Sequence, residues 1–411
     1  MSAGIPFDDR TPPRSNYPLR PNVRSRTIGT DRLRQHYYTN TTPDGERVLL
    51  VHGNSSSARF FEGLIASLTA CTVVAPDLRG YGASEREPVD AERGLRDFSD
   101  DLESLVTALG WETFHLLGWS LGGNIVMQYA IDHPERIKTL TLHATGSPYG
   151  YGGTKDERGM PNYADFAGSG GGLISPEVVV RFREKDFTAD SPFSPRSALR
   201  NVIVKPTYTF APDWEDALVE QMLMMVIGEQ FYPGNAQPSN NWPMSAPGDW
   251  GANNALSPKY CNLSGLATIA PKPPILWLRG ADDLMVSDAA AVDPAYLGQL
   301  GVIPGWPGAD VCPPQPMLRQ IRAVLDAYRA DGGRYDEVVF EDCGHSPLIE
   351  KPERFLLNFR NFIAGRPLDT PAAPTPAPEL TAAAEATQEE PAPESQPEQR
   401  RGPFDWFRRR S

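Results

Sequence analysis

The sequence lacks the features that mark a membrane-spanning, disulfide-bonded or nucleic-acid-binding chain. Only four cysteines occur in 411 residues, and their spacing fits neither a metal site nor a redox pair, so we expect a reducing compartment. No apolar run of about 18 residues and no signal-peptide core is present, which predicts no transmembrane segment and a cytoplasmic location. The 39 basic and 52 acidic residues give a net charge of −13, which argues against nucleic acid as a partner.

Both ends of the chain contain few of the apolar residues that a packed core requires. Residues 1–30 are rich in arginine and proline, and we interpret them as a disordered N-terminal arm. Residues 366–411 are dominated by proline, alanine and glutamate, and are predicted to form a disordered tail. The basic aromatic tip at 404–410 is a weak candidate for contact with a membrane surface or a protein, although an unbound tail is favoured.

Between these ends, short apolar runs alternate with stretches of helical period. Runs of this length, bounded by Gly, Pro or Asp, predict buried strands at 48–52, 72–75, 113–117, 137–143, 274–278 and 335–340. The helical periods predict helices at 98–109, 120–132, 318–330 and 353–363. Strands that alternate with helices indicate an α/β fold, with a mostly parallel central sheet and helices on both faces.

The alternation stops over residues 147–270, a segment dense in aromatic residues and methionines. We therefore predict a core made of residues 31–146 and 271–365, with 147–270 as an inserted cap subdomain. Most of the aromatic residues are expected to form the core of the cap itself. A cap of this size and composition nevertheless suggests a pocket for an apolar, medium-sized substrate.

One pentapeptide has the setting of a catalytic nucleophile. Gly118-Trp119-Ser120-Leu121-Gly122 follows a predicted strand and opens a predicted helix, which is the context of a nucleophile elbow. Glycines are needed there because the backbones approach closely, and the helix N-terminus after Ser120 favours an oxyanion. The alternative is a serine that caps an ordinary helix after a glycine turn.

A serine hydroxyl needs a base, and this is most often a histidine that a carboxylate holds. His345 follows the last predicted strand, on a loop at the carboxyl edge of the sheet, where open α/β sheets place their ligands. The histidines at 36, 115, 133 and 143 fall in or beside predicted elements and are interpreted as structural. Asp282 and Asp283 follow the strand at 274–278, and either could orient the imidazole.

These stretches together resemble the α/β-hydrolase family. His52-Gly53-Asn54-Ser55-Ser56 is similar to its oxyanion loop, and Asp77-Leu78-Arg79-Gly80-Tyr81-Gly82-Ala83-Ser84 to a stretch that we interpret as mainly architectural. Gly280-Ala281-Asp282-Asp283 is similar to its acid loop, and Gly344-His345-Ser346-Pro347 to its histidine region. The resemblance covers residues 33–146 and 271–365, and implies the α/β-hydrolase fold.

The resemblance also implies roles for individual residues. Its register selects Asp283 as the acid, with Asp282 as the alternative because residues 289–316 form a longer connection than the family usually has. The backbone N–H groups of Asn54 and Leu121 are implied to form the oxyanion hole. No metal, nucleotide or redox cofactor is needed for this chemistry.

A serine at position 120 disfavours the branches of the family that displace halide or open epoxides with a carboxylate. The resemblance therefore implies a serine hydrolase that cleaves a small-molecule carboxylic ester or lactone through an acyl-enzyme. The alternatives are a carbon–carbon bond hydrolase, an acyltransferase, and a ligand receptor with slow turnover.

Overall fold

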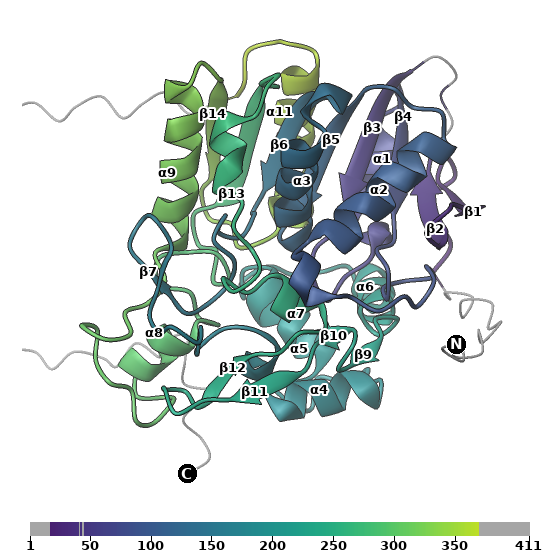
Figure 1. Ribbon diagram of the computed structural model, residues 1–411. Helices are drawn as coiled ribbons and strands as arrows, with labels where there is room; N and C mark the ends of the chain where they lie inside the picture. Colours follow the sequence, from purple (N-terminus) through teal and green to yellow (C-terminus); the bar gives the residue numbers. More distant parts are fainter. Residues whose placement is uncertain (1–16, 41, 43–44, 370–411) are drawn as a thin grey trace, which may run out of the picture.

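A computed structural model describes residues 17–40, 42 and 45–369. Within them, eight strands form one sheet in the order β1-β2-β4-β3-β5-β6-β13-β14 (Figure 1). The strands are β1 (Arg24–Gly29), β2 (Arg34–Thr39), β3 (Glu46–Val51), β4 (Cys71–Pro76), β5 (Phe114–Trp119), β6 (Ile137–His143), β13 (Ile275–Gly280) and β14 (Tyr335–Phe340). β1 and β2 pair antiparallel, and the strands from β4 to β14 pair parallel.

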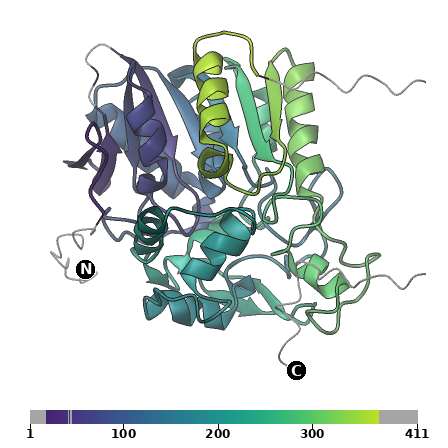
Figure 2. The ribbon, with the colours of Figure 1, turned by 180° about the vertical axis from the view of Figure 1, so that it is seen from behind.

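Helices cover both faces of this sheet. α2 (Arg96–Ala108), α3 (Leu121–Asp132) and α9 (Met317–Ala330) lie on one face, whereas α1 (Glu62–Ser67) and α11 (Pro352–Ile363) lie on the other (Figures 1 and 2). Every residue of β5 is buried, as expected for a central strand covered on both sides. The predicted α/β class with a mostly parallel sheet is therefore confirmed. Among the helices in the described part of the chain, none has the length and apolarity needed to cross a bilayer.

The predicted disordered arm of residues 1–30 contains a strand of the sheet. Residues Arg24–Gly29 form β1, which pairs with β2 over its whole length, and Ser25 Oγ lies 2.7 Å from His36 Nε2. The arm prediction was wrong here because the side chains of β1 are mostly exposed and show no apolar alternation. Hydrogen bonds between the backbones of β1 and β2 hold the strand, and amino-acid composition does not predict such pairing. Residues 1–16 of the predicted arm and 370–411 of the predicted tail lie outside the described residues.

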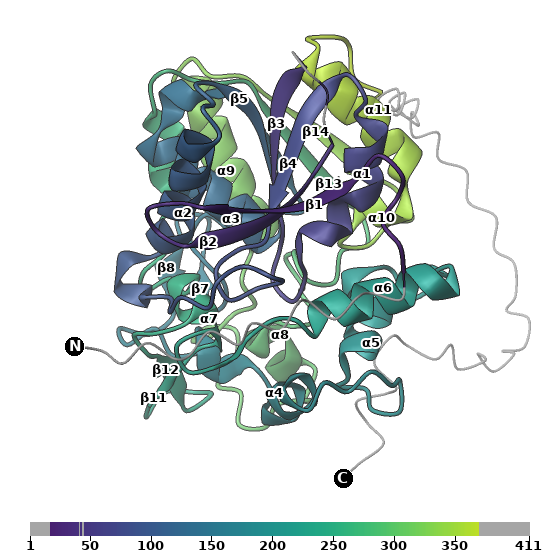
Figure 3. The same cartoon turned by 90° about the vertical axis from the view of Figure 1, so that its right-hand side faces the viewer.

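Small elements fill the chain between β6 and β13 and lie below the sheet in the view of Figure 1. They are β7 (Thr154–Lys155), β8 (Met160–Pro161), α4 (Pro176–Arg183), α5 (Pro195–Ala198), α6 (Pro212–Met222), β9 (Ile227–Gly228), β10 (Tyr232–Pro233), β11 (Ala236–Pro238), β12 (Ser245–Pro247) and α7 (Ala252–Ala255). We call residues 147–270 the insertion, and its standing as a separate subdomain stays a prediction. Figure 3 shows the same layer from the side.

The insertion meets the loops at the carboxyl ends of the strands. The N–H of Val226 donates to the carbonyl of Gly80 at 2.8 Å, and the N–H of Val89 donates to that of Gln230 at 2.9 Å. The long connection after β13 contains α8 (Pro294–Gln299) and also contacts the insertion, since Trp242 Nε1 donates to the Pro304 carbonyl at 3.0 Å. α10 (Pro347–Glu350) follows β14 at the same edge. The insertion therefore covers the edge where the predicted catalytic residues lie.

Asp77 organises the loop after β4 from the inside. Its carboxylate accepts the N–H groups of Ala58 and Ala83, both at 2.9 Å, and lies 2.7 Å from His36 Nδ1. Burial alone would raise the pKa of Asp77, but His36 and the N–H donors hold that pKa below its ordinary value. Gly82 has a φ of +51°, and a Cβ there would come within 2.0 Å of Asp77 Oδ2. These contacts agree with an architectural interpretation of the 77–84 stretch.

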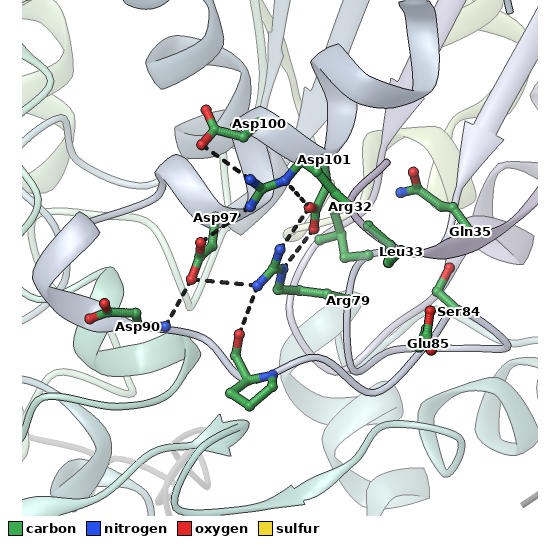
Figure 4. A network of polar contacts seen from close by, with 12 residues as sticks. Arg32, Leu33, Gln35, Arg79, Ser84, Glu85, Asp90, Asp97, Asp100 and Asp101 are labelled. Carbon is green, nitrogen blue, oxygen red and sulfur yellow. Dashed lines mark hydrogen bonds and ion pairs between the residues drawn. The ribbon is translucent and has the colours of Figure 1, made fainter. Parts of the chain in front are cut away.

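Arg79 ties the same loop to α2 through buried ion pairs (Figure 4). Its Nε and Nη2 donate to the two carboxylate oxygens of Asp101 at 2.6 and 2.7 Å. Arg32 Nε donates to Asp101 Oδ1 at 2.7 Å, and Asp97 lies 3.5 Å from Arg79. A bidentate pair of this kind fixes both distance and orientation between the loop and the helix.

We predict that Asp101→Asn lowers the free energy of unfolding by about 3 kcal/mol, because it leaves the buried guanidinium of Arg79 without its bidentate partner. Urea denaturation at neutral pH would measure this. Asp336→Asn is the matched control, since Asp336 pairs with the exposed Arg334 and should contribute less than about 1 kcal/mol. Equal effects of the two substitutions would contradict a structural role for the Arg79 pair.

Candidate active site

Ser120 occupies the sharp turn between β5 and α3. Its φ of 56° and ψ of −122° are sparsely populated values for a residue with a side chain. A Cβ at Gly118 would come within 2.2 Å of the Gly122 carbonyl oxygen, and one at Gly122 within 2.2 Å of the Val51 oxygen. Only glycine fits at these two positions. The sequence thus dictates a strained turn that holds Ser120 at the carboxyl edge of the sheet.

His345 and Asp283 meet at this edge from two different loops. His345 Nδ1 lies 2.8 Å from Asp283 Oδ2, and the two residues are only 1% and 5% exposed. The other oxygen, Asp283 Oδ1, accepts the N–H groups of Met285 and Val286 at 2.8 and 2.9 Å. A carboxylate held in this way fixes the proton of the imidazole on Nδ1, so that Nε2 carries the lone pair.

The other nitrogen of His345 is an open buried group. Nε2 has no hydrogen-bond partner among the described residues, Ser120 included. The loop of His345 nevertheless lies against the elbow, because Trp119 Nε1 donates to the His345 carbonyl at 3.1 Å. The Trp119 and His345 rings are 5.8 Å apart between centroids. The residue next to Ser120 therefore anchors the loop that carries the imidazole.

Asp282, the alternative acid, faces a different partner. Lys205 Nζ lies 2.6 Å from Asp282 Oδ2 and 2.5 Å from Asp342 Oδ1, so this lysine of the insertion bridges the two loops that carry Asp283 and His345. The two carboxylates raise the pKa of Lys205 above its ordinary value, which keeps the bridge charged. Of the two aspartates, the structure joins Asp283 to His345.

The other histidines have structural surroundings. His143 accepts the N–H of Ser120 with its backbone carbonyl at 3.0 Å, and its ring packs between Trp119 and Phe355. Burial first, and the nearby His345 second, lower the pKa of His143 well below its ordinary value, so it stays neutral. His115 Nδ1 lies 2.8 Å from Thr139 Oγ1. The site thus contains one histidine whose ring combines a carboxylate partner with an open nitrogen.

The 52–56 loop, which carries Asn54, and Leu121 at the start of α3 both lie next to Ser120. A Cβ on Gly53 would come within 2.8 Å of Ser120 Cβ, which places the 52–56 loop directly against the serine. Leu121 is the first residue of α3, so its N–H has no carbonyl partner within the helix. The Asn54 side chain is bound, because Tyr81 Oη donates to its Oδ1 at 2.5 Å and its Nδ2 donates to Asn253 Oδ1 at 2.7 Å.

Sequence reasoning did not assign site positions to Tyr81 and Asn253. Tyr81 falls within the stretch that we interpret as architectural, and Asn253 lies in the insertion, where no motif marks it. The contact between Asn54 and Asn253 joins residues 199 positions apart. No local pattern could have predicted this contact, because it depends on how the insertion sits on the core.

Glu350 braces the histidine loop on both sides of His345. Its carboxylate accepts the N–H of Gly344 at 2.9 Å, that of Ser346 at 3.2 Å, and that of Lys205 from the insertion at 3.1 Å. Hydrogen bonds to an ionised acceptor are stronger than those between neutral groups. Glu350 therefore orders the backbone next to the imidazole and connects this backbone to the insertion.

We predict that Glu350→Gln speeds amide hydrogen exchange at Gly344 and Ser346 by about tenfold to a hundredfold. A hydrogen bond to a charged group contributes about 1.5 to 3 kcal/mol, and glutamine keeps only one acceptor oxygen. Hydrogen exchange followed by mass spectrometry measures the effect. Glu353→Gln, at an exposed position of α11, should leave these amides unchanged. Unaltered exchange in Glu350→Gln would exclude the bracing role.

Comparison with known proteins supports the same architecture. Residues 46–169 match the family model described as the alpha/beta hydrolase fold. A solved serine hydrolase from the polyaromatic-hydrocarbon-degrading bacterium Cycloclasticus zankles superposes with a TM-score of 0.55 at 18% identity, covering 84% of this chain and 98% of that chain. This chain has the alpha/beta hydrolase fold. The resemblance seen in the sequence motifs is confirmed.

Curated relatives match part of this chain. The 2-hydroxymuconate semialdehyde hydrolase of Pseudomonas putida is 34% identical over 124 residues, which are 29% of this chain and 44% of the relative. The fluoroacetate dehalogenase of a Burkholderia species is 36% identical over 103 residues, or 24% of this chain and 34% of the relative. The matches thus span less than half the length of each relative.

Proposed function

We propose that this alpha/beta hydrolase is a serine hydrolase that cleaves a small-molecule carboxylic ester or lactone through an acyl-enzyme. One observation carries the proposal. His345 is bound at Nδ1 by Asp283, while its buried Nε2 has no partner among the described residues, on a loop that Trp119 anchors beside Ser120. An imidazole with this orientation suits a general base for a neighbouring hydroxyl.

In the proposed mechanism, Ser120 Oγ attacks the substrate carbonyl while His345 Nε2 takes its proton. Asp283 holds the imidazole tautomer and stabilises the cation that forms. The N–H groups of Asn54 and Leu121 bind the oxyanion, and each donor of this kind lowers the barrier by about 2.7 to 4 kcal/mol. His345 then protonates the leaving alcohol, and a water molecule activated by the same imidazole releases the acid.

The surroundings of the three groups support this chemistry. The Asp283–His345 pair is almost inaccessible to solvent, which strengthens its electrostatic interaction. The ring of His143, which packs against Trp119, stays neutral because burial lowers its pKa well below the ordinary value, so it adds no competing charge. The aromatic-rich insertion over the same edge supports an apolar, medium-sized substrate.

Two alternatives come from the relatives. The name of the Pseudomonas relative favours carbon–carbon bond hydrolysis as the second candidate, since this reaction can use the same three residues. The dehalogenase relative has a name that points to halide displacement, but a serine at position 120 disfavours a carboxylate mechanism here. The same site is also compatible with two other functions, those of an acyltransferase and of a ligand receptor with slow turnover.

We predict that a fluorophosphonate probe labels the wild-type protein covalently and that Ser120→Ala abolishes the label, because the probe reacts only with an activated hydroxyl. Intact-protein mass spectrometry would count the adducts. Absence of labelling in the folded wild-type protein would favour the receptor.

Asp283→Asn should slow the same labelling by about 10³- to 10⁴-fold, because an amide would hold the wrong imidazole tautomer. Asp282→Asn is the matched control. It removes a neighbouring carboxylate that pairs with Lys205, and should stay within about threefold of wild type, since surface ion pairs contribute little. The reverse order of the two variants would transfer the acid role to Asp282.

We also predict that p-nitrophenyl esters and lactones of short to medium acyl chains have higher kcat/KM values than vinylogous diketone acids of the ring-cleavage type. The reason is that the ester reaction needs only the groups already assigned. Absorbance assays on both panels, with Ser120→Ala as the blank, measure these kcat/KM values. Higher kcat/KM values for the diketone acids would contradict the proposed ester or lactone hydrolase and favour a carbon–carbon bond hydrolase.

A further inference from the structure

Side-chain contacts hold the tip of the 52–56 loop, which lies against Ser120. At the base of the loop, Ser56 Oγ donates to the Gly53 carbonyl at 2.7 Å, and His52 Nε2 accepts the N–H of Leu78 at 3.0 Å. The backbone N–H of Asn54 has no hydrogen-bond partner in the part of the chain that the structure describes. This N–H is therefore available to bind an oxyanion, but the backbone around it does not fix its direction.

The Asn54 side chain connects the tip to the core and to the insertion. Its Oδ1 accepts the hydroxyl of Tyr81, on the loop after β4, and its Nδ2 donates to Asn253 Oδ1 in α7 at 2.7 Å. The neighbouring Ser55 side chain hydrogen-bonds to the hydroxyl of Tyr232 in β10. Ser55 has a φ of 50°, and such a conformation persists only where surrounding contacts impose it. The insertion therefore contacts both residues of the tip.

The short helix α7 holds Asn253 in place between the insertion and the core. The fully buried side chain of Asn254 accepts the N–H of Gly171, elsewhere in the insertion, at 2.8 Å. Immediately before the helix, the N–H of Gly251 donates to the carbonyl of Val89 in the core at 2.8 Å. The oxygen that binds Asn54 thus has its place fixed by the way the insertion sits on the core.

We propose that Asn253 is a positioning residue for the oxyanion hole. Through the amide of Asn54 it holds the N–H of Asn54 toward the substrate carbonyl, so that the hole is complete only when the insertion lies on the core. This inference rests on the proposed function and adds a regulation of the same site. A donor of this kind acts only within about 3 Å of the developing oxyanion, so a small shift of the loop tip weakens it.

A comparison of an ester with its thionoester tests the positioning role. In O-p-nitrophenyl thionobutanoate a sulfur replaces the carbonyl oxygen of p-nitrophenyl butanoate, and sulfur accepts hydrogen bonds weakly. The ratio of the kcat values for ester and thionoester is divided by the same ratio for the hydroxide-catalysed reactions. This corrected ratio reports the hydrogen bonds that the oxyanion receives, whereas a general disturbance of the fold lowers both kcat values alike.

We expect Asn253→Ala to lower kcat for the ester about tenfold, and to leave kcat for the thionoester and both KM values within about twofold. Loss of a whole oxyanion donor costs about 10²- to 10³-fold, and here the donor is displaced but retained. The effect falls on kcat because the oxyanion develops only in the transition state. Asn240→Ala is the matched control, since Asn240 is an exposed asparagine of the same insertion, and it should leave the corrected ratio unchanged.

A double-mutant cycle tests whether Asn253 acts through Asn54. Asn54→Ala removes the side-chain amide but keeps the backbone N–H, and should lower the corrected ratio at least as much as Asn253→Ala does. Adding Asn253→Ala to Asn54→Ala should then change the ratio by less than about twofold, because both substitutions break the same contact. Effects that multiply in the double variant would show that Asn253 acts by another route, and would overturn the proposal.

An unchanged corrected ratio in Asn253→Ala, or equal losses for ester and thionoester, would also overturn the positioning role. These outcomes are distinct from failure of the proposed function, in which the folded wild-type protein neither reacts with the fluorophosphonate nor hydrolyses the butanoate ester. A wild-type protein that is labelled at Ser120 but has no excess preference for the ester would remain a serine hydrolase. It would lose the oxyanion role of the 52–56 loop, and with it the role of Asn253.

Discussion

The 2.8 Å contact between Asp283 and His345 is the interaction on which the arrangement of the site depends. It joins the loop after β13 to the loop after β14, and these loops are adjacent because the two strands pair in parallel from Ile275 and Tyr335 onward. The contact leaves one imidazole nitrogen facing away from the carboxylate, which is the condition for proton transfer at Nε2. Its burial makes it sensitive to any displacement of either loop.

The insertion takes part in this arrangement and is more than a cover. Lys205 links the loops of Asp283 and His345 through Asp282 and Asp342, and its backbone N–H binds Glu350. Asn253 binds the side chain of Asn54 on the other side of Ser120. The loops of Asp283 and His345, and the 52–56 loop, thus each contact residues of the insertion that are distant in sequence. A movement of the insertion would therefore alter the histidine loop and the 52–56 loop together.

Strands and helices of the sheet were predictable because each is a local property of periodicity and apolar content. β6 and β14 have the predicted bounds, and β5 and α3 differ from prediction by only one or two residues. β1 was missed because its exposed side chains carry no alternation, and its stability comes from pairing with β2. The elbow was recognisable because the close backbone approach at Gly118 and Gly122 excludes every other residue type.

The sequence by itself determined the order of the elements, the identity of the glycines around Ser120, and the residue types that could serve as nucleophile, acid and base. The family resemblance selected Asp283 by register and kept Asp282 as the alternative. Only the tertiary structure shows that Asp283 faces His345, because two adjacent carboxylates on one loop differ in the direction in which the folded backbone points them. It alone also brought Asn253 to Asn54 in the 52–56 loop, since a contact across 199 residues arises from packing, which no local pattern encodes.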